Sequence, residues 1–188
     1  MKDIVNQEVN EHISVANSLF IQSEEIVNCA KICINSLENG NKILLFGNGG
    51  SASDAQHIAA ELVGRYKIER NGLPAIALTT DTSIITSIGN DFGYDKIFSR
   101  QVEAIANEGD VLIGISTSGE SDNVISALKL AKKINCTSVG MSGRDGGEMN
   151  EICDVNLIVK SVDTARIQEM HILIGHIICN LIDQKFSS

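Results

Sequence analysis

The segment Val111-Leu-Ile-Gly-Ile-Ser-Thr-Ser-Gly-Glu-Ser121 contains the pattern that decides the fold. It begins with a short apolar run, 111–115, of the length and composition of a buried strand. Four hydroxyl side chains follow, and apolar residues then recur at helical spacing from Val124 to Ala131. A buried strand, a polar turn and a helix in this order are typical of a parallel α/β sheet.

The same order recurs before and after this segment. Short apolar runs that predict four further buried strands lie at 43–46, 75–78, 137–141 and 155–159. Helical spacing predicts N-terminal helices at about 3–38, ended by Asn39-Gly40, and one long final helix from Thr164 to about Ile182. We therefore expect an α/β fold, a three-layer sandwich in which helices flank a five-stranded parallel sheet, preceded by the N-terminal helices.

Length and charge limit the class of protein. With 188 residues, 43% of them apolar, and a single proline, the sequence predicts one domain over residues 1–188. The 15 basic and 24 acidic residues give a formal charge of -9, which disfavours nucleic acid and membrane surfaces as partners. No window supplies the roughly 20 apolar residues of a membrane span, and the first residues lack the apolar core of a signal peptide. We therefore expect a cytoplasmic protein.

The cysteines predict neither a metal ribbon nor a disulfide framework. They are odd in number and lack CxxC pairs: Cys29, Cys33, Cys136, Cys153 and Cys179. We expect them to be reduced and mostly buried, because free cysteine behaves as a small apolar residue.

Two loops that follow predicted strands have the composition of phosphate sites. The first, Gly47-Asn48-Gly49-Gly50-Ser51, leads into a helix for which Ser53 and Gln56 predict a capping box. Its glycines let backbone N–H groups approach an anion at the positive end of that helix. The loop lacks the GxGxxG spacing, and no GxxxxGK[ST] motif is present, which disfavours NAD and ATP.

The second loop carries the hydroxyl groups Ser116, Thr117, Ser118 and Ser121 ahead of another helix. Hydroxyls, backbone amides and a helix dipole can bind phosphate with little need for a cation, which suits an acidic protein. Either loop alone could equally be a set of turns and caps. Two such loops at neighbouring strand ends, where parallel sheets bind ligands, favour phosphate.

Four side chains on two predicted helices have the chemistry of a metal site. His57 and Glu61 are four residues apart on one helix, and Gln168 and His176 lie on the final helix. Two imidazoles, a carboxylate and an amide oxygen favour a divalent ion, with zinc the best match. His12 and His171 have the alternative interpretation of hydrogen-bonded core histidines.

Asn90-Asp91 adds polar groups after the second predicted strand, in what we expect to be a loop. These side chains could bind sugar hydroxyls. An Asx turn accounts for them nearly as well.

Taken together, these motifs resemble the phosphoheptose isomerases of the sugar isomerase (SIS) superfamily. The resemblance rests on Gly47-Asn-Gly-Gly-Ser51, His57-x-x-x-Glu61, Gly89-Asn-Asp-Phe-Gly93, Ser116-Thr-Ser-Gly-x-Ser121 and Ala165-Arg-Ile-Gln168 with His176. It implies an SIS-type fold and conversion of sedoheptulose 7-phosphate to D-glycero-D-manno-heptose 7-phosphate, the first step toward nucleotide-activated heptoses for lipopolysaccharide or other surface glycans. It also implies one zinc ion per subunit and a homotetramer.

The resemblance assigns roles residue by residue. Glu61 is the expected base and His176 its acid partner, because an aldose-ketose interconversion moves a proton between C1 and C2. The expected zinc ligands are His57, Glu61, Gln168 and His176. The expected substrate-binding residues are Asn48, Gly49, Gly50, Ser51, Glu61, Asn90, Asp91, Ser116, Thr117, Ser118, Ser121 and Gln168.

Two other functions stay open at this point. One is a non-enzymatic SIS regulator that binds a replication initiator, and the other is an isomerase of another sugar phosphate. The spacing of Gln168 and His176 raises a separate question, because eight residues of straight helix separate their Cα atoms by about 12 Å and their directions by about 80°. We therefore expect subunits to share the site, which places it at a subunit interface.

Overall fold

A five-stranded, entirely parallel sheet forms the centre of the computed structural model, which describes residues 1–187. Its order is β2-β1-β3-β4-β5. The strands are β1 (Ile43–Gly47), β2 (Ala75–Ala77), β3 (Val111–Ser116), β4 (Thr137–Gly143) and β5 (Val155–Val159). All five predicted strands are confirmed, with bounds that differ by at most two residues.

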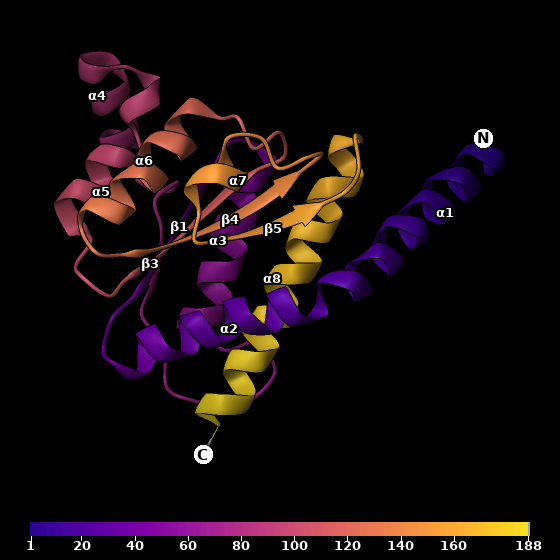
Figure 1. Ribbon diagram of the computed structural model, residues 1–188, viewed down its shortest axis with the longest axis horizontal. Helices are drawn as coiled ribbons and strands as arrows, with labels where there is room; N and C mark the ends of the chain where they lie inside the picture. Colours follow the sequence, from indigo (N-terminus) through magenta and orange to yellow (C-terminus); the bar gives the residue numbers. More distant parts are fainter. Residues whose placement is uncertain (188) are drawn as a thin grey trace.

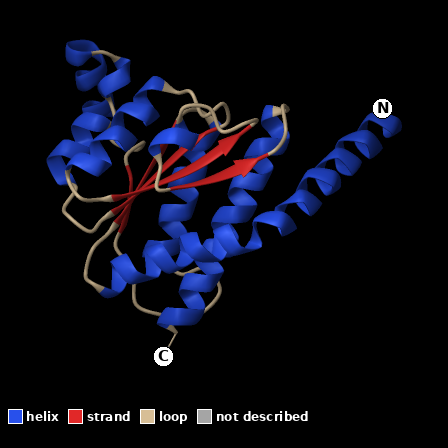
Figure 2. Cartoon of the chain, in the orientation of Figure 1, coloured by secondary structure: helices blue, strands red, loops and turns tan. Residues whose placement is uncertain are grey.

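Helices cover both faces of the sheet, as the predicted three-layer sandwich requires (Figures 1 and 2). Helices α2, α3 and α8 share one apolar core with the sheet, and α5, α6 and α7 share the other, with α4 packed against it. The helices are α1 (Lys2–Ser18), α2 (Ser23–Glu38), α3 (Gly50–Val63), α4 (Thr82–Phe92), α5 (Ser99–Ile105), α6 (Asp122–Lys133), α7 (Met149–Ile152) and α8 (Thr164–Phe186), with short 3-10 helices at Leu19–Gln22 and Tyr94–Lys96.

The alternation of side chains along β1 explains why this strand is apolar throughout. Ile43 and Leu45 belong to the core beneath α2, α3 and α8, whereas Leu44 and Phe46 belong to the opposite core. A strand that is covered on both faces has no polar side. Each of these four side chains is fully buried.

The direction of the strand order reverses between β1 and β3. These strands are direct neighbours, with Gly47 paired to Ile115, although β2 separates them in the sequence. Helix α3 follows β1 and covers one face of the sheet, whereas α6 follows β3 and covers the other face. In open parallel sheets, ligands bind beyond the carboxyl ends of strands at such a reversal, and both predicted phosphate loops lie there.

Helix α1 projects away from the body of the molecule (Figure 1), and none of its residues is buried. Its firmest link is to α8, where the buried Arg166 donates to the carboxylate of Glu8 at 2.9 Å and to that of Glu169 at 2.6 Å. The N-terminal helices are therefore confirmed, but α1 contributes little to the core.

The predicted capping box of Ser53 and Gln56 is wrong. Helix α3 begins three residues earlier, at Gly50, because Gly49 adopts a φ of 57° and turns the chain directly into the helix. The side chain of Gln56 instead donates to Thr79 at 3.2 Å.

The predicted loop at Asn90-Asp91 is also wrong, since both residues lie in α4. Asp81 caps this helix by accepting the N–H of Ile84 at 2.9 Å. Ile85 and Ile88 then pack against the core at helical spacing, so the helix continues until Gly93 ends it with a φ of 93°.

The cysteines match the prediction, since all five are free thiols and only Cys153 is not fully buried. Within residues 1–187, no helix combines the length and the apolar character that crossing a membrane requires.

Candidate active site

The glycine loop forms the entry to α3 and lies directly against α8. A Cβ atom on Gly50 would come within 2.6 Å of the Gln168 side-chain nitrogen, so only glycine leaves room for this amide. Ser51 is buried in the first turn of the helix. The predicted residues Gly49, Gly50, Ser51 and Gln168 are therefore brought together by the packing of two helices.

The hydroxyl loop is organised around Ser116. The Ser116 Oγ lies 3.3 Å from the Ser118 Oγ and 2.9 Å from the Ser121 Oγ. The Ser118 Oγ accepts the N–H of Glu120 at 3.1 Å, and Ser121 is the N-cap of α6. Three hydroxyls thus converge at the positive end of a helix, which is an arrangement suited to a phosphate group.

A cavity of about 830 Å³ opens beside this loop. Ser118 lines it together with the cations Arg144 and Lys160 and the carboxylates Glu120 and Asp145. Both signs of charge are present, so this cavity is not a purely cationic patch.

A pair of amides connects the two loops. Asn48 donates to the Asn123 side chain at 2.8 Å, and Asn123 donates back to Asn48 at 2.9 Å. Tyr94 adds its hydroxyl to the Asn48 side-chain oxygen at 3.2 Å. Asn123 is buried in the first turn of α6, so the loops after β1 and β3 are fixed relative to each other.

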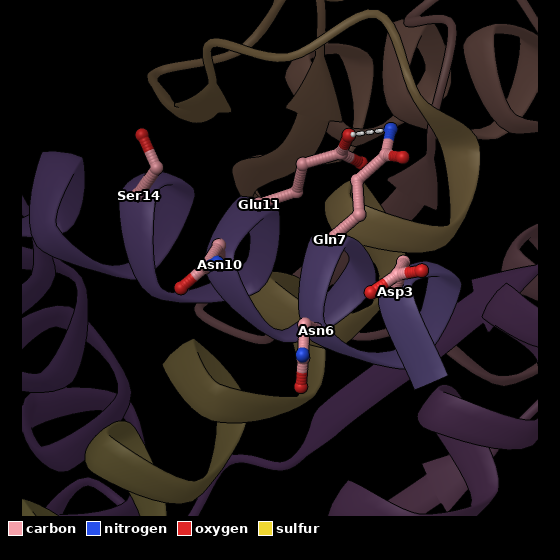
Figure 3. Close-up of a pocket in the computed structure, with 6 residues that line it drawn as sticks. All are labelled: Asp3, Asn6, Gln7, Asn10, Glu11 and Ser14. Carbon is pink, nitrogen blue, oxygen red and sulfur yellow. Dashed lines mark hydrogen bonds between the residues drawn. The ribbon is translucent and has the colours of Figure 1, made fainter. Parts of the chain in front are cut away.

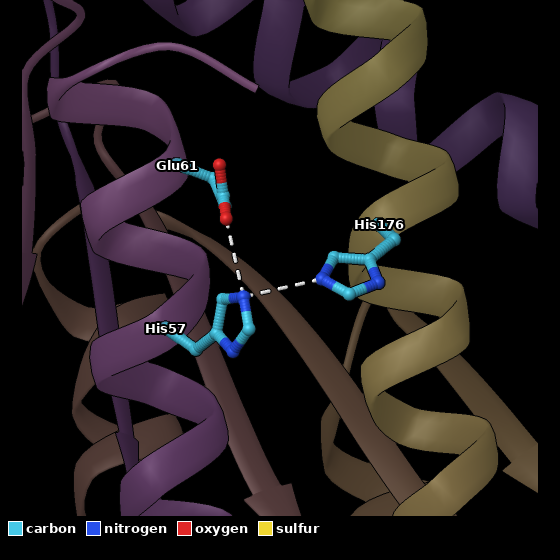
Figure 4. Close-up of side chains that lie close together, drawn as sticks. All are labelled: His57, Glu61 and His176. Carbon is cyan, nitrogen blue, oxygen red and sulfur yellow. Dashed lines mark hydrogen bonds and ion pairs between the residues drawn. The ribbon is translucent and has the colours of Figure 1, made fainter. Parts of the chain in front are cut away.

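The second part of the site is a cluster of three side chains (Figure 4). His57 and Glu61 lie further along α3, and His176 lies on α8. The His57 Nε2 is 3.1 Å from the Glu61 Oε1 and 3.3 Å from the His176 Nε2. One donor atom from each residue lies within 4.8 Å of the others, and this is the one such group among the described histidine, cysteine and acidic residues. Two helices that are remote in sequence therefore build one cluster.

The two imidazoles hold at most one proton between their facing nitrogens, since two N–H donors cannot point at each other across 3.3 Å. Burial lowers the pKa of His176, and the charge of His57 lowers it further, while Glu61 acts in the opposite direction. At least one of these two nitrogens therefore presents a lone pair to the cluster. Two imidazole nitrogens and a carboxylate oxygen in this arrangement fit zinc.

Gln168, the fourth expected donor, lies about two helical turns before His176 on α8. Helix α8 is continuous, as predicted, so the two side chains occupy different levels of the same helix. The Gln168 amide faces Gly50, whereas His176 faces His57.

The remaining predicted residues divide into two groups. Thr117 is half-buried within the hydroxyl loop. Asn90 and Asp91 are exposed on α4, where Asn90 donates to Asp91 at 2.8 Å.

Both histidines outside the cluster have hydrogen-bond partners, as expected. The ring of His171 is fully buried and bonds to the Ser142 carbonyl at 3.0 Å. His12 pairs with Glu169 at 2.8 Å, but it is half-exposed and does not belong to the core.

Similarity to known proteins agrees with this geometry. The SIS domain family matches residues 8–143. A phosphoheptose isomerase of Aliarcobacter butzleri is 60% identical over 188 residues, which are 100% of both chains. The chain belongs to the phosphoheptose isomerases of the SIS superfamily. A second phosphoheptose isomerase, from Campylobacter jejuni, is 56% identical over 186 residues, which are 99% of this chain and 100% of that one.

The solved structure of the Neisseria gonorrhoeae phosphoheptose isomerase has the same fold. Its TM-score is 0.93 at 46% identity, over 97% of this chain and 98% of that chain. The family resemblance and the SIS-type fold are therefore confirmed.

Three residues near the site escaped the sequence interpretation. Asp54 lies one turn before His57, its Oδ2 is buried without a hydrogen bond, and burial raises its pKa to about 6 against the lowering effect of His57. Tyr66 stacks on His176 with ring centroids 5.2 Å apart. Asn123 links the loops. Asn123 could have been suspected from the sequence, because it is a polar residue in the first helical turn after the hydroxyl loop. No local sequence pattern indicates that Tyr66 lies beside His176.

Proposed function

We propose that this chain converts sedoheptulose 7-phosphate to D-glycero-D-manno-heptose 7-phosphate, the first step toward nucleotide-activated heptoses for lipopolysaccharide or other surface glycans. The observation that carries the proposal is that α3 begins at the glycine loop and also carries His57 and Glu61 of the His-Glu-His cluster. The hydroxyl loop is held beside the glycine loop by the amide pair of Asn48 and Asn123. The names of the relatives, phosphoheptose isomerases at up to 60% identity, support the substrate.

The distance between the glycine loop and the His-Glu-His cluster supports a substrate long enough to reach both. Gly50 begins α3, and His57 follows seven residues later, which corresponds to a rise of about 10 Å along the helix axis. A sugar phosphate bound at the loops must extend over this length for its reacting carbons to reach the cluster.

In the phosphate site, Asn48, Gly49, Gly50, Ser51, Ser116, Thr117, Ser118 and Ser121 are the proposed binding residues. The hydroxyls of Ser118 and Ser121 already lie beside the Ser116 hydroxyl before a ligand binds. Phosphate binding therefore requires little rearrangement of these side chains. Gln168 at the glycine loop and Asn90 with Asp91 on α4 are proposed to contact the sugar hydroxyls.

Glu61 and His176 are the proposed proton-transfer groups. The Glu61 Oε1 faces His57, which leaves its second oxygen to remove a proton from C1. His176 gives a proton to the C2 oxygen, and the enediol forms. Glu61 then returns a proton to C2 while His176 recovers one from the C1 hydroxyl, which leaves an aldehyde at C1.

We propose one zinc ion per subunit, held by His57, Glu61 and His176 of one chain, with Gln168 of a neighbouring subunit as the fourth donor. When bound, zinc supplies Lewis-acid stabilisation of negative charge on the substrate oxygens. Removing metal with a chelator should abolish turnover, and zinc should restore it.

The proposed assembly is a homotetramer with active sites at subunit interfaces. Exposed apolar side chains on α1, among them Ile4, Val9 and Ile13, support association. So does an apolar groove of about 440 Å³ between the α1–α2 junction and α8, which Phe20 and Leu173 line. A hollow on another face of α1 has only polar lining, with Gln7 bonded to Glu11 at 2.8 Å, and gives no comparable argument (Figure 3).

Mixed subunits test the shared site. A chain with Gln168→Ala and a chain with His176→Ala are each expected to be inactive. If a partner supplies Gln168, activity should return in proportion to the hybrid interfaces; hybrids that form and stay inactive would refute sharing.

The five free cysteines support action in a reducing compartment, and we propose the cytoplasm. The substrate is tested by product analysis across five- to seven-carbon sugar phosphates. Turnover of the seven-carbon ketose above all others is expected. Absence of any conversion would favour the regulator that binds a replication initiator, and preference for a shorter sugar would favour an isomerase of another sugar phosphate.

A further inference from the structure

The connection between α3 and β2 is fastened to α8 by a buried ion pair. The Arg70 Nε donates to the Asp183 Oδ1 at 2.7 Å, and these side chains are 1% and 0% exposed. The other Asp183 oxygen accepts the backbone N–H groups of Lys67 at 2.7 Å and Ile68 at 3.0 Å. A single carboxylate on α8 thus fixes the path of residues 66–70.

The same arginine ties this connection to the end of α3. Its guanidinium donates to the carbonyls of Glu61 and Leu62, each at 2.9 Å. The last carbonyls of a helix have no partner within the helix. Arg70 satisfies the carbonyl of Glu61 and shares the carbonyl of Leu62 with the N–H of Leu73. Arg70 therefore connects the turn that carries Glu61 to the helix that carries His176.

These bonds hold the connection so that the Tyr66 side chain lies against the cluster. Its ring stacks on the His176 ring, with centroids 5.2 Å apart and an angle of 23° between planes. The His57 ring meets His176 edge-on, at 5.0 Å and 68°. The ammonium of Lys67 lies 5.0 Å from the centre of the Tyr66 ring. The imidazole of His176 therefore has an aromatic neighbour besides His57.

We infer that Tyr66 is a positioning residue, which holds the His176 imidazole in the orientation that completes the cluster with His57 and Glu61. The inference rests on the proposed metal site. The outer torsion of a histidine is broad, so its ring direction must be set by packing or hydrogen bonds. Stacking sets it here, where many metal-binding histidines rely on a hydrogen bond to the second nitrogen.

Cobalt binding tests the inference without turnover. The metal-free protein is titrated with Co²⁺, whose absorption reports both affinity and geometry, for wild type, Tyr66→Phe and Tyr66→Leu. Phenylalanine keeps the stacked ring, so its affinity should stay within about threefold of wild type. Leucine should weaken binding about 10-fold or more, the usual effect of losing a supporting group around a ligand. Ile68→Ala, two residues away in the same connection, is the control and should bind as wild type does.

The position of the ring is read separately by NMR of the metal-free protein. In wild type and Tyr66→Phe, the His176 ring protons should be shifted upfield by the stacked aromatic ring. In Tyr66→Leu the shift should vanish and the contact between the His57 and His176 rings should weaken.

Wild-type cobalt affinity in the folded Tyr66→Leu variant would overturn the inference, as would an unchanged contact between the His57 and His176 rings. If wild type itself binds no metal, the proposed metal site fails. The NMR contact then decides alone whether Tyr66 positions the imidazole.

Discussion

The hydroxyl loop and the His-Glu-His cluster are built in opposite ways. The loop comes from six consecutive residues, and its bonds among Ser116, Ser118 and Ser121 stay within that segment. The cluster joins His57 to His176 across 119 positions, so it exists only where α3 packs on α8. The phosphate site should therefore tolerate changes in helix packing that destroy the cluster.

The largest expected effect separates the two regions by function. Glu61→Gln and His176→Gln each remove a proton-transfer group, which should lower kcat by about 100- to 10,000-fold. Binding of inorganic phosphate, measured by competition or calorimetry, should stay close to that of wild type. Near-normal turnover in either folded variant would contradict the assigned roles.

Acid should loosen α8 through His171. Burial lowers the pKa of this ring to about 4, against the raising effect of its bond to the Ser142 carbonyl. Above pH 6.5 the folded and unfolded chains are both neutral at this position. As the pH falls toward 4, only the unfolded chain takes up the proton, so the free energy of unfolding drops.

The contribution of His171 between pH 7 and 4 is on the order of 3 kcal/mol. Urea denaturation at both pH values measures it. The His171→Gln variant keeps an N–H donor but cannot titrate, so its stability should fall less. An equal fall in both proteins would show that the proton goes elsewhere.

Widening the contact between α3 and α8 should damage the cluster alone. A Cβ on Gly175 would come within 2.5 Å of the Ile58 Cδ1, so Gly175→Ala forces the helices apart at a cost of about 1–3 kcal/mol. Metal affinity and kcat should fall while phosphate binding holds. Combining it with Ile58→Ala, which removes both clashing atoms, Cδ1 at 2.5 Å and Cγ1 at 2.7 Å, should recover part of the metal affinity. No recovery would assign the loss to something other than this contact.

The difference between the regions also explains what the sequence could predict. Strand composition correctly predicted the sheet and placed Gly49 and Ser116 at the ends of β1 and β3, because those signals are local. Helical spacing paired His57 with Glu61, and their metal-binding chemistry, with the resemblance, joined His176 to them. The helix cap at Asp81 overrode the loop expected at Asn90-Asp91, and the positive φ of Gly49 displaced the cap expected at Ser53.

Tyr66 and Asn123 mark the limit of such reasoning. Each acts through a partner that the chain brings close only after folding: His176 for the first and Asn48 for the second. No spacing within either segment indicates that partner.

The smallest effects are expected within the hydroxyl loop. Ser116→Ala, Ser118→Ala and Ser121→Ala should each weaken substrate binding by about 1–3 kcal/mol, the value of a hydrogen bond to a charged group. Cobalt affinity at the cluster should be unchanged. An equal loss for a ketose without phosphate would contradict the assignment.

The most direct test of the central claim is isomerisation in deuterium oxide. Purified protein is incubated with sedoheptulose 7-phosphate, and the product is examined by NMR and mass spectrometry. Because Glu61 holds the transferred proton where solvent can exchange it, the account predicts D-glycero-D-manno-heptose 7-phosphate with deuterium at C2, and no such product with Glu61→Gln. Deuterium at C2 formed equally well by Glu61→Gln would contradict the role of Glu61 as the base, and no product at all from wild type would contradict the isomerase assignment.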